Sequence, residues 1–233
     1  MKRFFLHQRY ILVLFGVLIP LVSKADFWES PKVKTYYSEN REYKLIVTPR
    51  IISDKYYVWR FYSNDRHPQT KKFLRQKEKF MKKITPQDTI LIPCTAELYR
   101  INETDTIQIW RAPLLNDVSP VHAIVSNDGS SIATFDNWYS TGYGVNVFVV
   151  YNENGEAKRT YKLDEITPFP LNDYMMTISS LRWFRDTKFI DNEKIEIIFK
   201  TRDHLQQRRV YNTRNFEFEE FEEWHKPKQI GSR

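Results

Sequence analysis

The sequence predicts an all-β protein of about ten antiparallel strands, arranged as a propeller-blade-like open pair of sheets or as a β-sandwich, with one short basic helical insertion. Three observations support this fold class. Runs of β-branched and aromatic residues recur along the chain and are separated by short polar turns. Helical periodicity is confined to one long segment, residues 69–83. The length of 233 residues suits one domain, so we expect a single β domain over residues 26–233.

The first 25 residues have the three parts of a secretory signal peptide. A basic start is followed by an apolar run over residues 11–22, and Ser23 and Ala25 are the small residues that suit a cleavage site. The apolar run is shorter than the roughly 20 residues that a membrane span needs. We therefore expect residues 1–25 to direct export and the mature protein to be periplasmic or extracellular. An uncleaved membrane anchor is the alternative.

Charge and cysteine content exclude several classes of protein. The chain carries 36 Lys and Arg against 29 Asp and Glu, a net charge of +7. The signal segment holds four of these bases and no acid, so the mature chain would carry only +3, which does not favour nucleic-acid binding. A single cysteine, Cys94, excludes an intramolecular disulfide framework, and its apolar neighbours predict a buried thiol. No spacing typical of a metal site or a nucleotide cofactor occurs, so we expect neither.

The expected strands follow one another with polar turns between them. Asn154-Gly155 lies between two β-rich runs and is the strongest hairpin signal in the chain. The run over residues 145–151 is apolar on both faces, which indicates a central strand covered on both sides. The strands are expected over residues 43–48, 56–62, 95–101, 106–111, 121–126, 131–135, 145–151, 156–162, 181–184, 194–200, 207–211 and 215–218.

The middle of the chain resembles a known family. Residues 121–129 read Val-His-Ala-Ile-Val-Ser-Asn-Asp-Gly, and residues 134–138 read Thr-Phe-Asp-Asn-Trp. This order resembles a family of exported bacterial proteins with propeller-blade-like Ser-x-Asp-Gly turns and a Thr-Phe-Asp-Asn-Trp stretch, over residues 90–200. The resemblance implies a blade-like β fold and an envelope location, and it brings no activity. The family has a small residue in place of His122 and a His in place of Tyr139, which argues against a catalytic role for either.

The segment from Asp136 to Gly144 holds the densest group of candidate ligand-binding side chains. Aromatic faces could stack on a sugar, a peptide or an anionic polymer, while carboxylate and amide groups orient it. The alternative is a structural loop whose aromatic rings pack on the core. The candidate ligand-binding residues are Asp136, Asn137, Trp138, Tyr139 and Tyr143.

A basic insertion over residues 66–84 is the second candidate. Residues 66–83 contain eight Lys and Arg against one Glu. A partly helical segment of this composition could contact an anionic lipid surface or an acidic partner through charge and apolar burial. The alternatives are a solvated insertion, or docking against the glutamate-rich residues 216–224, where the acidic-to-basic tail 219–233 begins. The candidate anionic-surface residues are Lys71, Lys72, Arg75, Lys79, Lys82 and Lys83.

Three function classes remain open on the sequence. The leading hypothesis is a non-catalytic binding or interaction module of the bacterial envelope, whose partner is an envelope protein or a glycan. The second is an exported hydrolase acting on glycan or peptide, in which Asp136 would meet Asp128 or Asp164 in space. The third is peripheral contact with an anionic membrane through residues 66–83. Export argues against a nucleic-acid partner.

Overall fold

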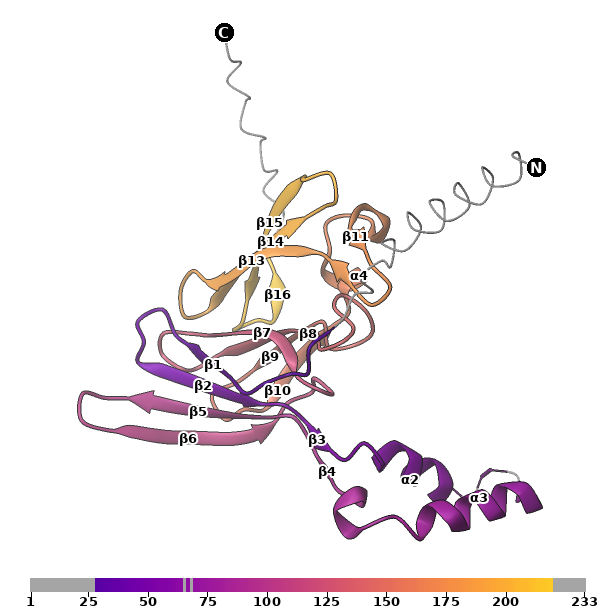
Figure 1. Cartoon of the computed structure of the whole chain (residues 1–233). Coiled ribbons are helices and arrows are strands. Elements are labelled where there is room, and N and C mark those ends of the chain that lie inside the picture. Colours follow the sequence, from indigo (N-terminus) through magenta and orange to yellow (C-terminus); the bar gives the residue numbers. More distant parts are fainter. Residues whose placement is uncertain (1–27, 65, 68, 220–233) are drawn as a thin grey trace, which may run out of the picture.

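The computed structural model describes residues 28–64, 66–67 and 69–219, and these residues confirm the all-β fold. The expected signal peptide and all of the tail except Glu219 lie outside the described residues. The body consists of three four-stranded antiparallel sheets rather than two (Figure 1). Strands that neighbour each other in a sheet also follow each other in the sequence, apart from one insertion between β2 and β5. Each sheet is therefore a meander, as a propeller blade is.

The strands of the three sheets and the elements between them have the following bounds. The N-terminal sheet contains β1 (Lys34–Tyr37), β2 (Tyr43–Thr48), β5 (Thr95–Ile101) and β6 (Thr106–Pro113). The middle sheet contains β7 (Pro120–Val125), β8 (Ile132–Asn137), β9 (Phe148–Tyr151) and β10 (Ala157–Tyr161). The C-terminal sheet contains β13 (Phe184–Phe189), β14 (Lys194–Lys200), β15 (Gln206–Asn212) and β16 (Glu217–Phe218). The connection between the last two sheets contains α4 (Leu163–Ile166), η2 (Leu171–Asp173), β11 (Met175–Met176) and β12 (Leu181–Arg182).

The middle sheet is buried on both faces. One face packs Phe135, Phe148 and neighbouring residues against the C-terminal sheet. The other face packs Val149 and Tyr151 against the N-terminal sheet. All four residues of β9 are buried, which confirms the central covered strand that the two apolar faces of this run predict. The three sheets thus form a stack with two hydrophobic cores.

The outer faces of the two end sheets are polar. Glu97 pairs with Arg111 on the N-terminal sheet, at 3.3 Å. On the C-terminal sheet, Glu196 lies between Lys188 and Arg208 and pairs with both. Charged side chains thus occupy both faces where a further sheet of the stack would need apolar contacts.

The basic insertion is larger than expected and forms a helical arm, residues 51–92. The arm is inserted between β2 and β5, and in Figure 1 it extends from the N-terminal sheet away from the stack. Its root is held by a backbone hydrogen bond from Arg50 N to Val118 O, 2.8 Å, and by the ion pair of Arg50 with Asp117. The arm contains β3 (Ile51–Ile52), α2 (Tyr56–Ser63), α3 (Lys71–Met81), η1 (Pro86–Thr89) and β4 (Leu91–Ile92), with β3 and β4 paired.

The prediction of a strand over residues 56–62 is wrong, because this segment is helix α2. Its aromatic residues favour a strand only where a pleated, half-buried surface is available. In the arm, Trp59 and Tyr62 fall three positions apart on one side of a helix, where they can face α3. The Tyr62 ring packs at 5.5 Å from Phe73 and 5.4 Å from Phe80 of α3, between ring centroids. Packing between the helices thus overrides the local propensity.

Candidate functional site

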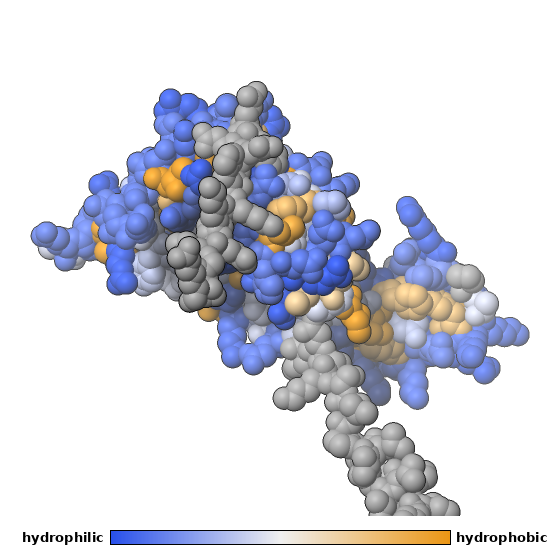
Figure 2. Space-filling view, turned by 90° about the horizontal axis from the view of Figure 1, so that it is seen from above, coloured by the Kyte–Doolittle hydropathy of each residue, from blue (hydrophilic) through white to orange (hydrophobic). Residues whose placement is uncertain are grey.

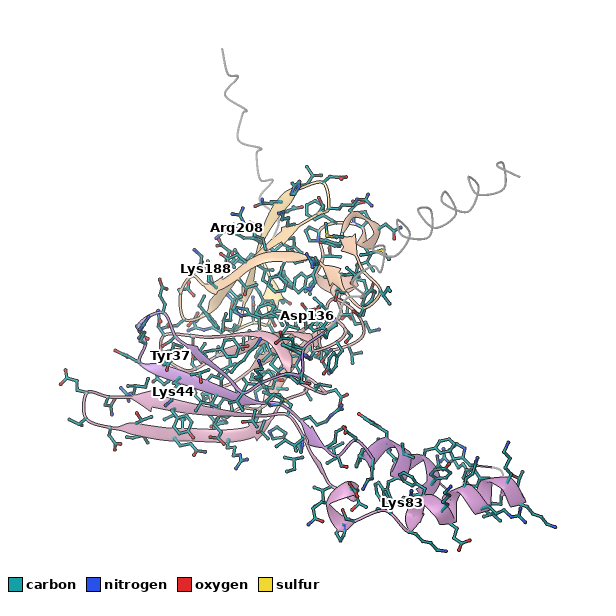
Figure 3. All side chains as sticks on the ribbon, viewed as in Figure 1. Tyr37, Lys44, Lys83, Asp136, Lys188 and Arg208 are labelled. Carbon is teal, nitrogen blue, oxygen red and sulfur yellow. The ribbon has the colours of Figure 1, made fainter. Side chains whose placement is uncertain are left out.

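Asp136 lies at the end of β8 and is fully buried. Both of its carboxylate oxygens accept a hydrogen bond from Trp183 Nε1, at 3.0 Å, and one accepts from Gly142 N at 2.6 Å. Burial raises the pKa of Asp136 to about 7, against the opposing effect of these two N–H donors. Figure 3 shows Asp136 inside the body, far from Lys83 on the arm. The carboxylate therefore closes its own loop and ties the middle sheet to Trp183.

The other candidate residues of this loop also bond within the protein. Asn137 Nδ2 donates to Val145 O at 2.7 Å, which links the two ends of the loop. Trp138 Nε1 donates to Glu29 O, and the Trp138 ring packs edge-on against Trp28 at 5.4 Å. The structure thus brings the loop residues together and engages the polar atoms of three of them.

The last two loop candidates differ from each other in exposure. Tyr143 is half-buried and packs against the core cluster of the middle and C-terminal sheets. Tyr139 remains 42% exposed, although its ring still contacts Trp28 at 6.0 Å. Most of the loop is therefore a structural loop whose side chains pack and bond within the protein, which is the alternative to ligand binding.

Asn116 supports this loop, and no pattern in the sequence marks it. It is fully buried in the connection between β6 and β7. Its Nδ2 donates to Asp136 O at 2.9 Å, and its Oδ1 accepts from Thr134 Oγ1 at 2.8 Å. An asparagine in a polar connection resembles any turn residue, so only its burial identifies the role.

The carboxylates considered for a hydrolase do not converge. Asp128 precedes β8 and bonds to Ser126 and Ser130 within its turn, whereas Asp136 lies near the other end of the strand. At about 3.3 Å per residue, the part of β8 from Ile132 to Asp136 alone spans roughly 13 Å. Asp164 lies in α4 and is exposed, whereas Asp136 is fully buried. No group of three His, Cys, Asp or Glu side chains among the described residues could hold a metal ion.

Cys94 lies at the start of β5, next to the root of the arm. It is 1% exposed, and burial raises the pKa of its thiol to about 12. A thiol in this state is not a nucleophile at neutral pH. The buried position agrees with the apolar run in which the residue occurs.

The two helices of the arm are held together by aromatic contacts, in which Tyr62 of α2 packs against Phe73 and Phe80 of α3. Thr70 caps α3, because its side chain accepts a hydrogen bond from Phe73 N. At the base, the Asp88 carboxylate accepts hydrogen bonds from Ser53, Thr85 and Lys55, and these bonds lower the pKa of Asp88. The arm thus has capping and hydrogen bonds of its own, in addition to the contacts of Arg50 that hold its root.

The surface of the arm combines exposed apolar and basic side chains. No residue of α2 or α3 is buried. Figure 2 shows orange apolar residues running along the arm between blue hydrophilic ones. The exposed apolar residues of the arm are Ile51, Tyr57, Val58, Phe61, Leu74, Met81, Ile90, Leu91 and Ile92.

All six candidate anionic-surface residues are exposed on the arm. Lys82 pairs with Glu78 at 2.7 Å. The other five make no hydrogen bond or ion pair through their side chains with any residue that the structure describes; they are Lys71, Lys72, Arg75, Lys79 and Lys83. The described part of the glutamate-rich segment does not lie against them, because Phe216 and Phe218 pack on the core of the C-terminal sheet.

The sequence predicts the basic side of the arm and the apolar residues Phe73, Phe80 and Met81 beneath it, but not the apolar residues that flank residues 66–84. Ile51 and Ile92 form a two-stranded stem, and Tyr57, Val58 and Phe61 come from the segment that was expected to be a strand. A helical reading of residues 56–63 places these three residues on one face at spacings of one, three and four. None of the helices in the described ranges is both long and apolar enough to cross a membrane.

Comparison with protein-family models and with curated proteins finds no match to this chain.

Proposed function

We propose that this chain is an exported, non-catalytic interaction module of the bacterial envelope, and that it attaches to an anionic membrane surface through the arm, residues 51–92. The observation that carries the proposal is the exposed apolar surface of the arm, bordered by basic side chains without partners among the described residues. In the loop after Asp136, by contrast, the polar groups of Asp136, Asn137 and Trp138 already have partners.

The two helices have the amphipathic pattern of an interfacial element. In α3, Phe73 and Phe80 pack against Tyr62 of α2, whereas Leu74 and Met81, each one position further on and seven residues apart, are exposed beside them. Lys72 falls on the opposite side, together with Arg75 and Lys79. Such a helix lies in the plane of the membrane surface, with its apolar side in the headgroup region and its bases beside anionic lipid.

Charge complementarity selects the partner. Residues 66–83 carry eight bases against one acid, and each base near an anionic leaflet contributes about 1 kcal/mol to binding. A second copy of the chain would bring an equally basic arm. Self-association between two arms would therefore place like charges next to each other, which is unfavourable. A lipid surface offers negative charge and an apolar layer next to each other, which matches both sides of the arm.

The proposal is tested by co-sedimentation with vesicles of phosphatidylglycerol and phosphatidylcholine, compared with vesicles of phosphatidylcholine alone. We expect binding to the anionic vesicles that weakens steeply as salt rises from 50 to 500 mM. Lys72→Glu with Lys79→Glu should reduce binding at least tenfold. The matched control, Lys32→Glu with Lys158→Glu, changes the same charge on exposed residues of the body and should change binding less than threefold.

The contribution of the apolar side chains to membrane binding is tested by a second pair of double variants, one on the arm and one on the body. Leu74→Ser with Met81→Ser should weaken binding, whereas Val33→Ser with Ile178→Ser replaces two exposed apolar residues of the body and should not. Equal binding to neutral and anionic vesicles, or equal loss in arm and body variants, would overturn the proposal.

A further inference from the structure

A cavity of about 250 Å³ opens on the C-terminal sheet, beside β11, β12 and the turn between β14 and β15. Its wall contains four bases, Arg182, Arg185, Lys200 and Arg202, with His204 near the turn. Phe184 and Met175 add an aromatic and an apolar surface. Among the residues that the structure describes, none that lines the cavity carries a carboxylate.

The backbone holds these bases in place. Arg182 is paired with Met175 between β12 and β11. Lys200 N donates to Trp183 O at 2.9 Å, and Arg202 N donates to Asp173 O at 2.8 Å. Arg185 lies where the register between β13 and β14 shifts, a bulge of the kind that redirects a side chain. Four separate constraints thus direct positive charge at one cavity.

The charges at the cavity are less neutralised than those on the rest of the sheet. The side chains of Arg182 and Lys200 make no hydrogen bond or ion pair with the described part of the chain. Arg185 donates to the neutral Gln206, and Arg202 has only an exposed contact of 3.7 Å with Asp203.

Three bases elsewhere on the same sheet have carboxylate partners. Lys188 and Arg208, labelled in Figure 3, both pair with Glu196, and Lys194 pairs with Glu219. Grouped bases without acids repel one another, and a bound anion would relieve that repulsion.

We infer that this cavity is a binding site for a phosphate monoester with an apolar or aromatic substituent. A monoester carries a charge of about −1.5 to −2 near neutral pH and presents three acceptor oxygens. Guanidinium groups donate to such oxygens in pairs, and a lysine adds a compact charge. The substituent packs against Phe184 and Met175, which lie at the same cavity. The site is on the opposite end sheet from the arm and does not depend on the function proposed for the arm.

Titration calorimetry with phenyl phosphate on the full chain tests the inference. We expect saturable binding at 50 mM salt that inorganic phosphate displaces. Arg182→Gln with Lys200→Gln should weaken it at least tenfold. The matched control, Lys188→Gln with Arg208→Gln, removes two bases of the same sheet away from the cavity and should leave affinity within twofold. All variants are first compared by thermal unfolding, and Arg182→Gln alone replaces the double variant if that one is unfolded.

Vesicles distinguish the two sources of such a group. If the cavity variant loses a preference for phosphatidic acid over phosphatidylglycerol, the site takes a lipid headgroup. If it loses phenyl phosphate but keeps its vesicle binding, the site takes a free phosphate ester. Absence of phenyl phosphate binding, or equal loss in the cavity and control variants, would overturn the inference.

Discussion

The loop from Asp136 to Gly144 and the arm over residues 51–92 contain similar kinds of side chain in opposite situations. Both are rich in aromatic and polar residues, and both are binding candidates on composition. In the loop, the carboxylate, the amide and one indole bond to the protein's own groups. In the arm, no residue of α2 or α3 is buried. The difference shows that residue composition can suggest a binding surface. Whether a side chain is free to bind depends on the contacts that it makes within the fold.

The largest effect should come from removing the acceptor at the centre of the loop. Asp136→Ala leaves the N–H groups of Trp183 and Gly142 buried without a partner. Each such group costs about 1–3 kcal/mol, so we expect the free energy of unfolding to fall by about 4 kcal/mol in urea titration. Unfolding of the variant at the wild-type midpoint would show that the loop is not a structural element.

The second-largest effect is the pH dependence of stability that the Asp136 carboxyl produces. Because burial raises the pKa of Asp136 to about 7 in the folded protein, the folded state holds more protons than the unfolded state between pH 4 and 7. This contribution to stability is therefore fully present below pH 4 and is lost as pH rises through 7. The stability difference between wild type and Asp136→Asn should shrink by about 2 kcal/mol from pH 5 to pH 7.

Measuring that difference also controls for other titrating groups. Burial lowers the pKa of His122, which acts in the opposite direction over part of the same range and is common to both proteins. A difference that stays constant with pH would mean that Asp136 is ionised throughout.

Two glycines of the loop give a matched pair of smaller effects. Both have positive φ, +73° at Gly142 and +78° at Gly144, so alanine is strained at either. A Cβ at Gly142 would lie 2.7 Å from Leu181 Cβ, whereas one at Gly144 would meet no atom within 4 Å. We expect Gly142→Ala to lower the free energy of unfolding by about 1.5 kcal/mol more than Gly144→Ala. Equal costs would mean that the loop does not pack closely on Leu181.

The smallest effect on stability should be found on the arm. Leu74 and Met81 are 45% and 37% exposed, so replacing both by serine should change the free energy of unfolding by less than about 0.5 kcal/mol. The same double variant should lose vesicle binding. A large loss of stability would show that the apolar side of the arm supports the fold, as the loop does.

Much of the body could be predicted from the sequence because its signals are local. Asn154-Gly155 turns the chain between β9 and β10, and the two apolar faces of β9 match its burial between two sheets. Segment 56–62 could not be assigned in this way, since its aromatic residues suit a strand or a helix equally and Phe73 and Phe80 decide between them. The roles of Asp136 and Asn116 depend on partners such as Trp183 and Thr134 that are distant in sequence.

The most direct test of the contrast between loop and arm is amide hydrogen exchange with and without phosphatidylglycerol vesicles, followed by mass spectrometry. We expect peptides from residues 51–92 to exchange quickly in solution and to gain protection when vesicles are added. Peptides from residues 136–144 should be protected under both conditions. Protection that vesicles induce in the loop, with no change in the arm, would contradict the assignment of the arm as the binding element.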